Sequence, residues 1–78
     1  MERPFDRQLG ALRKNLIQMA SMVETAIANA GKSLIERNSE LARLVVKSDE
    51  QIDSLELEID KQCVDLLGLR QPMAIDLR

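Results

Sequence analysis

Apolar residues recur along the first half of the chain with alternating steps of four and three residues. The row consists of Phe5, Leu9, Leu12, Leu16, Met19, Val23, Ala26 and Ala30. This spacing places the side chains along one side of a helix and is typical of a heptad seam between packed helices. Toward its end the stripe drifts to Ile27 and Leu34, as a nearly straight helix requires when it outruns a seven-residue repeat. The pattern predicts one long helix over residues about 4–37, with a proline in its first turn.

A second heptad register follows the polar segment Glu36-Arg37-Asn38-Ser39, in which Asn38 or Ser39 can cap the next helix. One column of this register is Val45, Ile52, Ile59 and Leu66, and the complementary column is Leu41, Ser48, Leu55, Gln62 and Leu69. The register predicts a second helix over residues about 39–68, which ends near Gly68 and before Pro72.

Two members of this second register, Ser48 and Gln62, are polar. Polar residues at core heptad positions weaken a dry seam and can specify its register. Ser48 also begins a Ser-x-x-Gln capping box, which would allow a break in the helix. The apolar repeat continues through Ser48 without a change of phase, so we predict that the helix is unbroken.

The short connection between the two predicted helices favours an all-α fold, a long antiparallel hairpin. Further apolar residues off the main seam of the second helix make its apolar face too wide for one partner helix: Val46, Leu57 and Val64. A third helix is predicted to start at about 72–78. We therefore expect the bundle to be completed by downstream sequence or by another copy of the chain, as a homo-oligomer (dimer or tetramer).

The length and cysteine content of the chain limit what it can be. Seventy-eight residues form at most one small domain with a marginal core, and no disulfide stabilises it because Cys63 is the single cysteine. With no histidine in the sequence, a Cys/His zinc site is excluded, and Cys63 lacks the base that a cysteine nucleophile usually needs. We expect a reducing, cytoplasmic setting and predict that Cys63 is a small buried apolar residue.

The charge balance, the aromatic content and the hydropathy of the chain argue against a nucleic-acid-binding protein and against a membrane-spanning protein. The 11 basic and 13 acidic residues nearly balance and Phe5 is the single aromatic residue, so neither a basic footprint nor base-stacking platforms support nucleic-acid binding. The sequence also has no long apolar run typical of a signal peptide or a membrane span. Membrane association is therefore expected to be peripheral only.

Four carboxylates follow one side of the second predicted helix at spacings of four, three and four residues: Asp49, Asp53, Glu56 and Asp60. We call these four residues the acidic stripe. Lys and Arg are absent from the positions three or four residues away from each of them, so their mutual repulsion is not offset on the same helix. A metal ion, a basic partner, or water with counterions can neutralise the stripe. Its carboxylates suit hard cations such as Mg²⁺, Ca²⁺, Mn²⁺ or iron, although the spacing alone favours a solvated acidic face.

Four motifs carry a resemblance to a known family. They are Phe5-Asp6-x-x-Leu9, Leu34-Ile35-Glu36-Arg37-Asn38, Asp49-Glu50-x-Ile52-Asp53-x-Leu55-Glu56-x-Glu58-Ile59, and Gln71-Pro72-x-Ala74-x-Asp76-Leu77-Arg78. Over essentially its whole length the chain resembles the N-terminal part of the PhoU family of phosphate-signalling regulators. Residues 1–78 would then be a partial PhoU domain, a truncated three-helix bundle.

The resemblance implies a protein of two three-helix repeats, in which acidic motifs on the second and third helices of a repeat face each other around clusters of metal ions. The resemblance implies that Asp49 and Asp53 are metal ligands. It also implies that the cofactor is a cluster of several metal ions, which could be iron, manganese, zinc or magnesium. Glu56 and Asp60 are expected to be solvated or to face a partner. The opposing motif and the second repeat are absent from this sequence, so its metal site is at most half complete.

The function implied is a non-catalytic negative regulator of phosphate uptake and of phosphate-starvation two-component signalling. Its partners would be the sensor histidine kinase and the ATPase subunit of the phosphate transporter. An alternative is a structural coiled-coil oligomerisation module whose acidic face is simply solvated. A metal-dependent hydrolase is the weakest reading, because the sequence has no histidine, no nucleophile beside a base and no phosphate-binding glycine loop.

Overall fold

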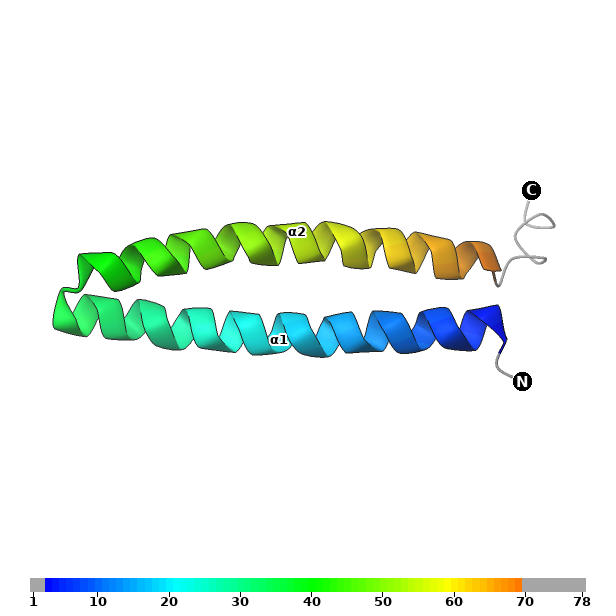
Figure 1. Cartoon of the computed structure of the whole chain (residues 1–78), viewed down its shortest axis with the longest axis horizontal. Coiled ribbons are helices and arrows are strands. Elements are labelled where there is room, and N and C mark those ends of the chain that lie inside the picture. The colour runs from blue at the N-terminus through cyan, green and yellow to red at the C-terminus, as the bar shows by residue number, and fades with distance from the viewer. Residues whose placement is uncertain (1–2, 70–78) are drawn as a thin grey trace.

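The computed structural model describes residues 3–69, which form an antiparallel hairpin of two long helices (Figure 1). Helix α1 spans Pro4–Glu36 and helix α2 spans Ser39–Leu69. Each bound lies within one residue of the position expected from the sequence, and the all-α hairpin is confirmed. The third helix predicted at about 72–78 lies outside the described residues. Neither α1 nor α2 is long and apolar enough to cross a membrane.

The turn between the helices is built from main-chain hydrogen bonds that close the end of α1. The N–H of Asn38 donates to the carbonyl of Ser33 at 2.9 Å, and the N–H of Arg37 donates to the carbonyl of Leu34 at 3.4 Å. These two bonds form a Schellman motif, which requires a left-handed residue directly after the helix. Arg37 takes that conformation, with φ 51° and ψ 45°, at a steric cost of about 1–2 kcal/mol for a residue other than glycine.

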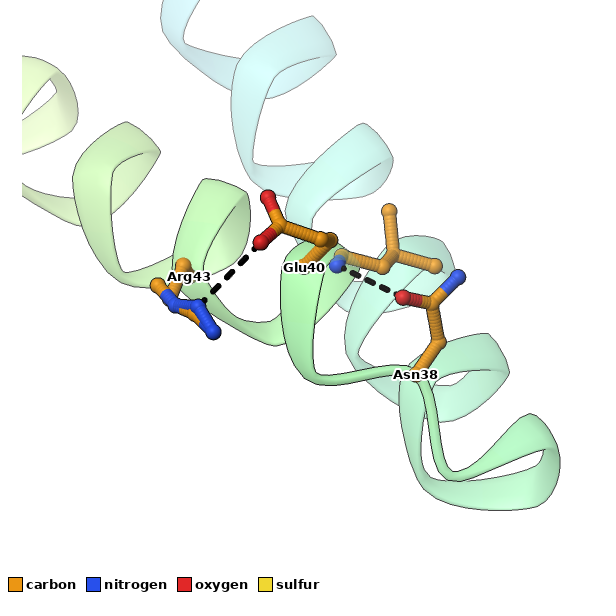
Figure 2. A network of polar contacts seen from close by, with 4 residues as sticks. Asn38, Glu40 and Arg43 are labelled. Carbon is orange, nitrogen blue, oxygen red and sulfur yellow. Dashed lines mark hydrogen bonds and ion pairs between the residues drawn. The ribbon is translucent and has the colours of Figure 1, made fainter.

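Asn38 also starts α2, so a single residue serves both helices (Figure 2). Its side-chain Oδ1 accepts a hydrogen bond from the N–H of Leu41 at 3.1 Å, and its carbonyl accepts one from the N–H of Ala42 at 3.0 Å. The sequence alone did not decide whether Asn38 or Ser39 caps α2. The hydrogen bonds show that Asn38 is the cap. Such a cap contributes about 1 kcal/mol.

The predicted seam of α2 is the side that packs on α1. Ile59 and Leu66 are 6% and 7% exposed, the lowest values on this helix. The other members of the seam are half-buried, apart from Leu69 at the end of the described chain: Leu41, Val45, Ser48, Ile52, Leu55 and Gln62. The helix continues through Ser48, whose Oγ donates to the carbonyl of Val45 at 2.7 Å. The unbroken helix is therefore confirmed.

The predicted seam of α1 is only half right. Leu12 is buried, and Phe5, Met19 and Ala26 from the same column are half-buried against α2. The second predicted column is wrong, because Leu9, Leu16 and Val23 are 36%, 45% and 36% exposed. The drift to Ile27 and Leu34 is also wrong as a description of the packed side, since these residues are 67% and 80% exposed.

The residues that replace that column in the seam are Asn15, Met22 and Asn29, all half-buried. The side-chain Nδ2 of Asn15 donates to Oε1 of Gln62 at 2.9 Å across the helix interface, 47 residues apart in sequence. α1 is turned so that this polar pair meets, while the more apolar column on the other side of Leu12 remains exposed.

We expect Asn15 and Gln62 to be energetically coupled. Replacing Gln62 alone with Leu leaves the half-buried Asn15 amide without this partner and is expected to destabilise the hairpin by about 1 kcal/mol. Replacing both residues with Leu is expected to recover that loss. Urea unfolding of the two single variants and the double variant measures the coupling in a double-mutant cycle. Additive losses would show that the pair contributes nothing as a pair.

The last turn of α1 contains a buried polar residue. Ser33 is 8% exposed, and its Oγ donates to the carbonyl of Ala30 at 2.8 Å. A Cβ added at Gly31, two residues earlier, would meet no atom within 4 Å. In the last turn of α1, Ser33 is therefore the buried position of the described hairpin.

Candidate functional site

The hairpin has two broad faces, which can be told apart by the hollows that lie between the helices. One hollow is lined by mostly polar residues: Ser21, Met22, Thr25, Ala26, Asn29, Leu44, Ser48 and Gln51. The other is apolar and is lined by Phe5, Leu12, Cys63, Leu66 and Leu67. We call the side of the first hollow the polar face and the side of the second the open face.

The acidic stripe lies on the open face of α2. Positions seven residues apart share nearly the same side of a helix, so Asp49 and Glu56 lie in line with Cys63. By the same spacing Asp53 and Asp60 lie in line with Leu67. On this side of α2, the positions that directly precede the stripe and those that directly follow it are apolar.

An apolar row of α1 lies beside the stripe on the same face. Thr25 lines the hollow of the polar face. Val23 is two residues away, which is a rotation of about 200° around α1, so Val23 lies on the opposite side of the helix from Thr25. Leu9 and Leu16 precede Val23 by multiples of seven residues and share its side. The open face is therefore apolar along α1 and acidic along the middle of α2.

The four carboxylates of the stripe are exposed to solvent. The ion pairs described within residues 3–69 join other residues, namely Arg3 with Asp6 and Arg43 with Glu40, each at 3.3 Å. Asp49 and Asp53 lie one turn apart on a continuous helix, as the sequence indicated. No group of three or more metal-binding side chains occurs in this part of the chain. The metal role of Asp49 and Asp53, and the partner role of Glu56 and Asp60, stay predictions.

Cys63 is not buried, contrary to the expectation from its residue type. It is an exposed free cysteine at the rim of the apolar hollow. The prediction of burial for Cys63 was wrong because the heptad column of Cys63 lies beside the seam of α2 rather than in it. The sequence reading also missed Asn15, Met22 and Asn29, although their seven-residue spacing was a signal that could have found them.

Comparison with known proteins gives the family. Residues 16–78 match the model of the PhoU domain. The chain is 41% identical over 78 residues to a phosphate-specific transport system accessory protein PhoU homolog of Pseudomonas putida, covering 100% of the chain and 30% of that relative. It is 38% identical over 76 residues to the homolog of Zymomonas mobilis, covering 97% of the chain and 32% of the relative.

A third relative is the phosphate-specific transport system accessory protein PhoU of Escherichia coli K12, with 34% identity over 74 residues, 95% of the chain and 31% of the relative. The chain thus spans about a third of the length of the curated relatives that it matches. No solved structure matches it. The resemblance seen in the motifs is confirmed, and the match over residues 16–78 places the chain in the PhoU domain family.

Proposed function

We propose that this chain is the first part of a non-catalytic negative regulator of phosphate uptake and phosphate-starvation signalling. The observation that carries the proposal is the match of residues 16–78 to the PhoU domain, and the open face, where the acidic stripe lies beside an exposed and mainly apolar row of α1, offers a surface for partners. Exposed apolar side chains next to a charged stripe form a surface that is suited to protein contacts. Its relatives are named as accessory proteins of the phosphate-specific transport system, which supports this assignment.

A metal fits the open face only in part. Asp49 and Asp53 can each give a carboxylate oxygen to a hard cation, but the described residues offer no third ligand beside them. The remaining ligands of a multinuclear iron, manganese, zinc or magnesium site would come from outside residues 3–69. Bound there, the metal would neutralise the stripe and allow another helix to cover it.

The proposed partners are the sensor histidine kinase and the ATPase subunit of the phosphate transporter, met at the cytoplasmic side of the membrane. Glu56 and Asp60 extend the acidic stripe beyond the proposed ligands and would attract a basic patch on such a partner. Complementary charge of this kind mainly raises the association rate and the specificity.

The test compares two double variants of the protein that carries this chain. Asp49→Asn with Asp53→Asn removes two charges from the open face. Glu58→Gln with Asp65→Asn removes two charges from the same helix in the column of Leu44 and Gln51, which line the polar-face hollow. Each variant is introduced into bacteria that lack their own copy, and a phosphate-starvation reporter is measured in phosphate-rich medium.

We expect the Asp49/Asp53 variant to lose repression of the reporter and the Glu58/Asp65 variant to keep it. For the purified proteins, added Mn²⁺ is expected to raise the melting temperature of the Glu58/Asp65 variant and not that of the Asp49/Asp53 variant. Full repression by both variants would contradict the proposal and favour a structural module with a solvated acidic face.

A further inference from the structure

Two different heptad seams are available on α1, and they share one central column. That column consists of Phe5, Leu12, Met19 and Ala26. On one side of it lies the apolar flank, which we define as Leu9, Leu16 and Val23, and on the other side lies the polar flank, Asn15, Met22 and Asn29. Either flank completes a seam with the central column, because its residues follow that column at steps of three or four. The two seams differ by a rotation of α1 of about 50°, half the angle between adjacent residues.

The hairpin packs the polar flank against α2. All three residues of this flank are half-buried, whereas those of the apolar flank are 36%, 45% and 36% exposed. Burial of apolar area alone favours the other seam, because Leu9, Leu16 and Val23 carry more apolar surface than two asparagines and a methionine. The choice between the two seams therefore points to a polar contribution.

The contact that distinguishes the two seams is the part-buried hydrogen bond of 2.9 Å from Nδ2 of Asn15 to Oε1 of Gln62. Gln62 belongs to the seam of α2, and a rotation of α1 does not move it out of the interface. With the apolar flank packed, Asn15 would turn toward water and the Gln62 amide would face apolar side chains. A polar group that is buried without a partner costs more than an ordinary hydrogen bond contributes. Gln62 therefore disfavours the rotated arrangement.

We propose that Asn15 and Gln62 form a rotational latch, which holds the polar flank of α1 against α2 and keeps the apolar flank beside the acidic stripe. A single polar pair that specifies one arrangement of helices is a known use of polar residues in coiled coils. The two residues act by positioning, since the latched rotation sets which side of α1 borders the open face. The latch is a property of the hairpin and does not depend on the partners proposed above.

The test follows the rotation of α1 by NMR in the 78-residue chain. Met22 lines the polar-face hollow together with Leu44 and Ser48, so its methyl group is expected to show nuclear Overhauser contacts to these two residues in the latched rotation. Gln62→Leu removes the acceptor of Asn15 and makes the seam of α2 apolar at that position. In this variant we expect the Met22 contacts to disappear and the methyl groups of Leu16 to gain contacts to the seam of α2.

Two further variants separate the latch from a general effect of the substitution. Gln51→Leu is the matched control, because Gln51 is an exposed glutamine of the same helix and is not the partner of Asn15. The exchanged pair Asn15→Gln with Gln62→Asn keeps one donor and one acceptor across the interface. Both variants are expected to keep the Met22 contacts.

Three results would each overturn the proposal. The first is persistence of the Met22 contacts in Gln62→Leu, which would show that the polar pair does not set the rotation. The second is loss of these contacts in Gln51→Leu or in the exchanged pair. The third is a Gln62→Leu chain that has lost its helices by circular dichroism, because no second packed arrangement would then be available to α1.

Discussion

Ile59→Ala is expected to lower the free energy of unfolding by about 2–5 kcal/mol, enough to unfold much of the chain at room temperature. Ile59 is 6% exposed and belongs to a cluster that contains only Leu12 and Leu66 as further buried members among the described residues. Truncation removes apolar contact and leaves a cavity that two long helices cannot easily close. Helix content at 222 nm, followed against urea, measures the change.

Leu57→Ala is the matched control for this loss. Leu57 lies two residues before Ile59 on the same helix but is 70% exposed, so its truncation is expected to change stability by less than about 0.5 kcal/mol. A comparable loss from both variants would show that the core is not the cluster around Ile59.

The double variant Gly10→Ala, Gly31→Ala is expected to gain about 2 kcal/mol of stability. Both glycines lie inside α1 without a positive φ, and a Cβ at either position meets no atom within 4 Å. Alanine therefore adds helix propensity, worth about 1 kcal/mol at each site, without a clash. The measurement is again urea unfolding, together with the two single variants, which are expected to contribute additively because the sites are far apart.

The reverse substitution Ala28→Gly serves as the control, because Ala28 is an exposed residue of the same helix. It is expected to lose about 1 kcal/mol. A loss of stability in the glycine-to-alanine variant would mean that another helix contacts α1 where these glycines lie.

The sequence predicted the packed side of α2 well because one apolar heptad column, Val45, Ile52, Ile59 and Leu66, runs through the helix without interruption. Ile59 and Leu66 lie in one column, and the polar Ser48 and Gln62 lie in its neighbour, where both were placed correctly. α1 was harder to predict because its central column is flanked by Leu9, Leu16 and Val23 on one side and by Asn15, Met22 and Asn29 on the other. Hydrophobicity alone favours the first set, whereas the structure packs the second set toward α2, where Asn15 donates a hydrogen bond to Gln62.

From the sequence, the candidate site could be predicted only as a row of carboxylates along one helix. The spacing of Asp49, Asp53, Glu56 and Asp60 correctly indicated carboxylates along one side of α2. It could not show that this side is continuous with an uncovered apolar row of α1, because that depends on how α1 is turned about its axis. The same rotation decides the exposure of Cys63, which residue type alone predicts wrongly.

The distribution of large and small residues along the hairpin also bears on how it folds. The turn is locally well specified by Asn38, but the seam residues of α1 beside it, Asn29 and Ser33, are small or polar. The large buried side chains lie near the other end, and Leu12 is 47 residues from Ile59 in sequence. Most of the loop-closure entropy is therefore lost before much apolar surface is buried. We therefore expect the rate-limiting event of folding to be the meeting of the distant helix ends, after an early and reversible closure of the turn.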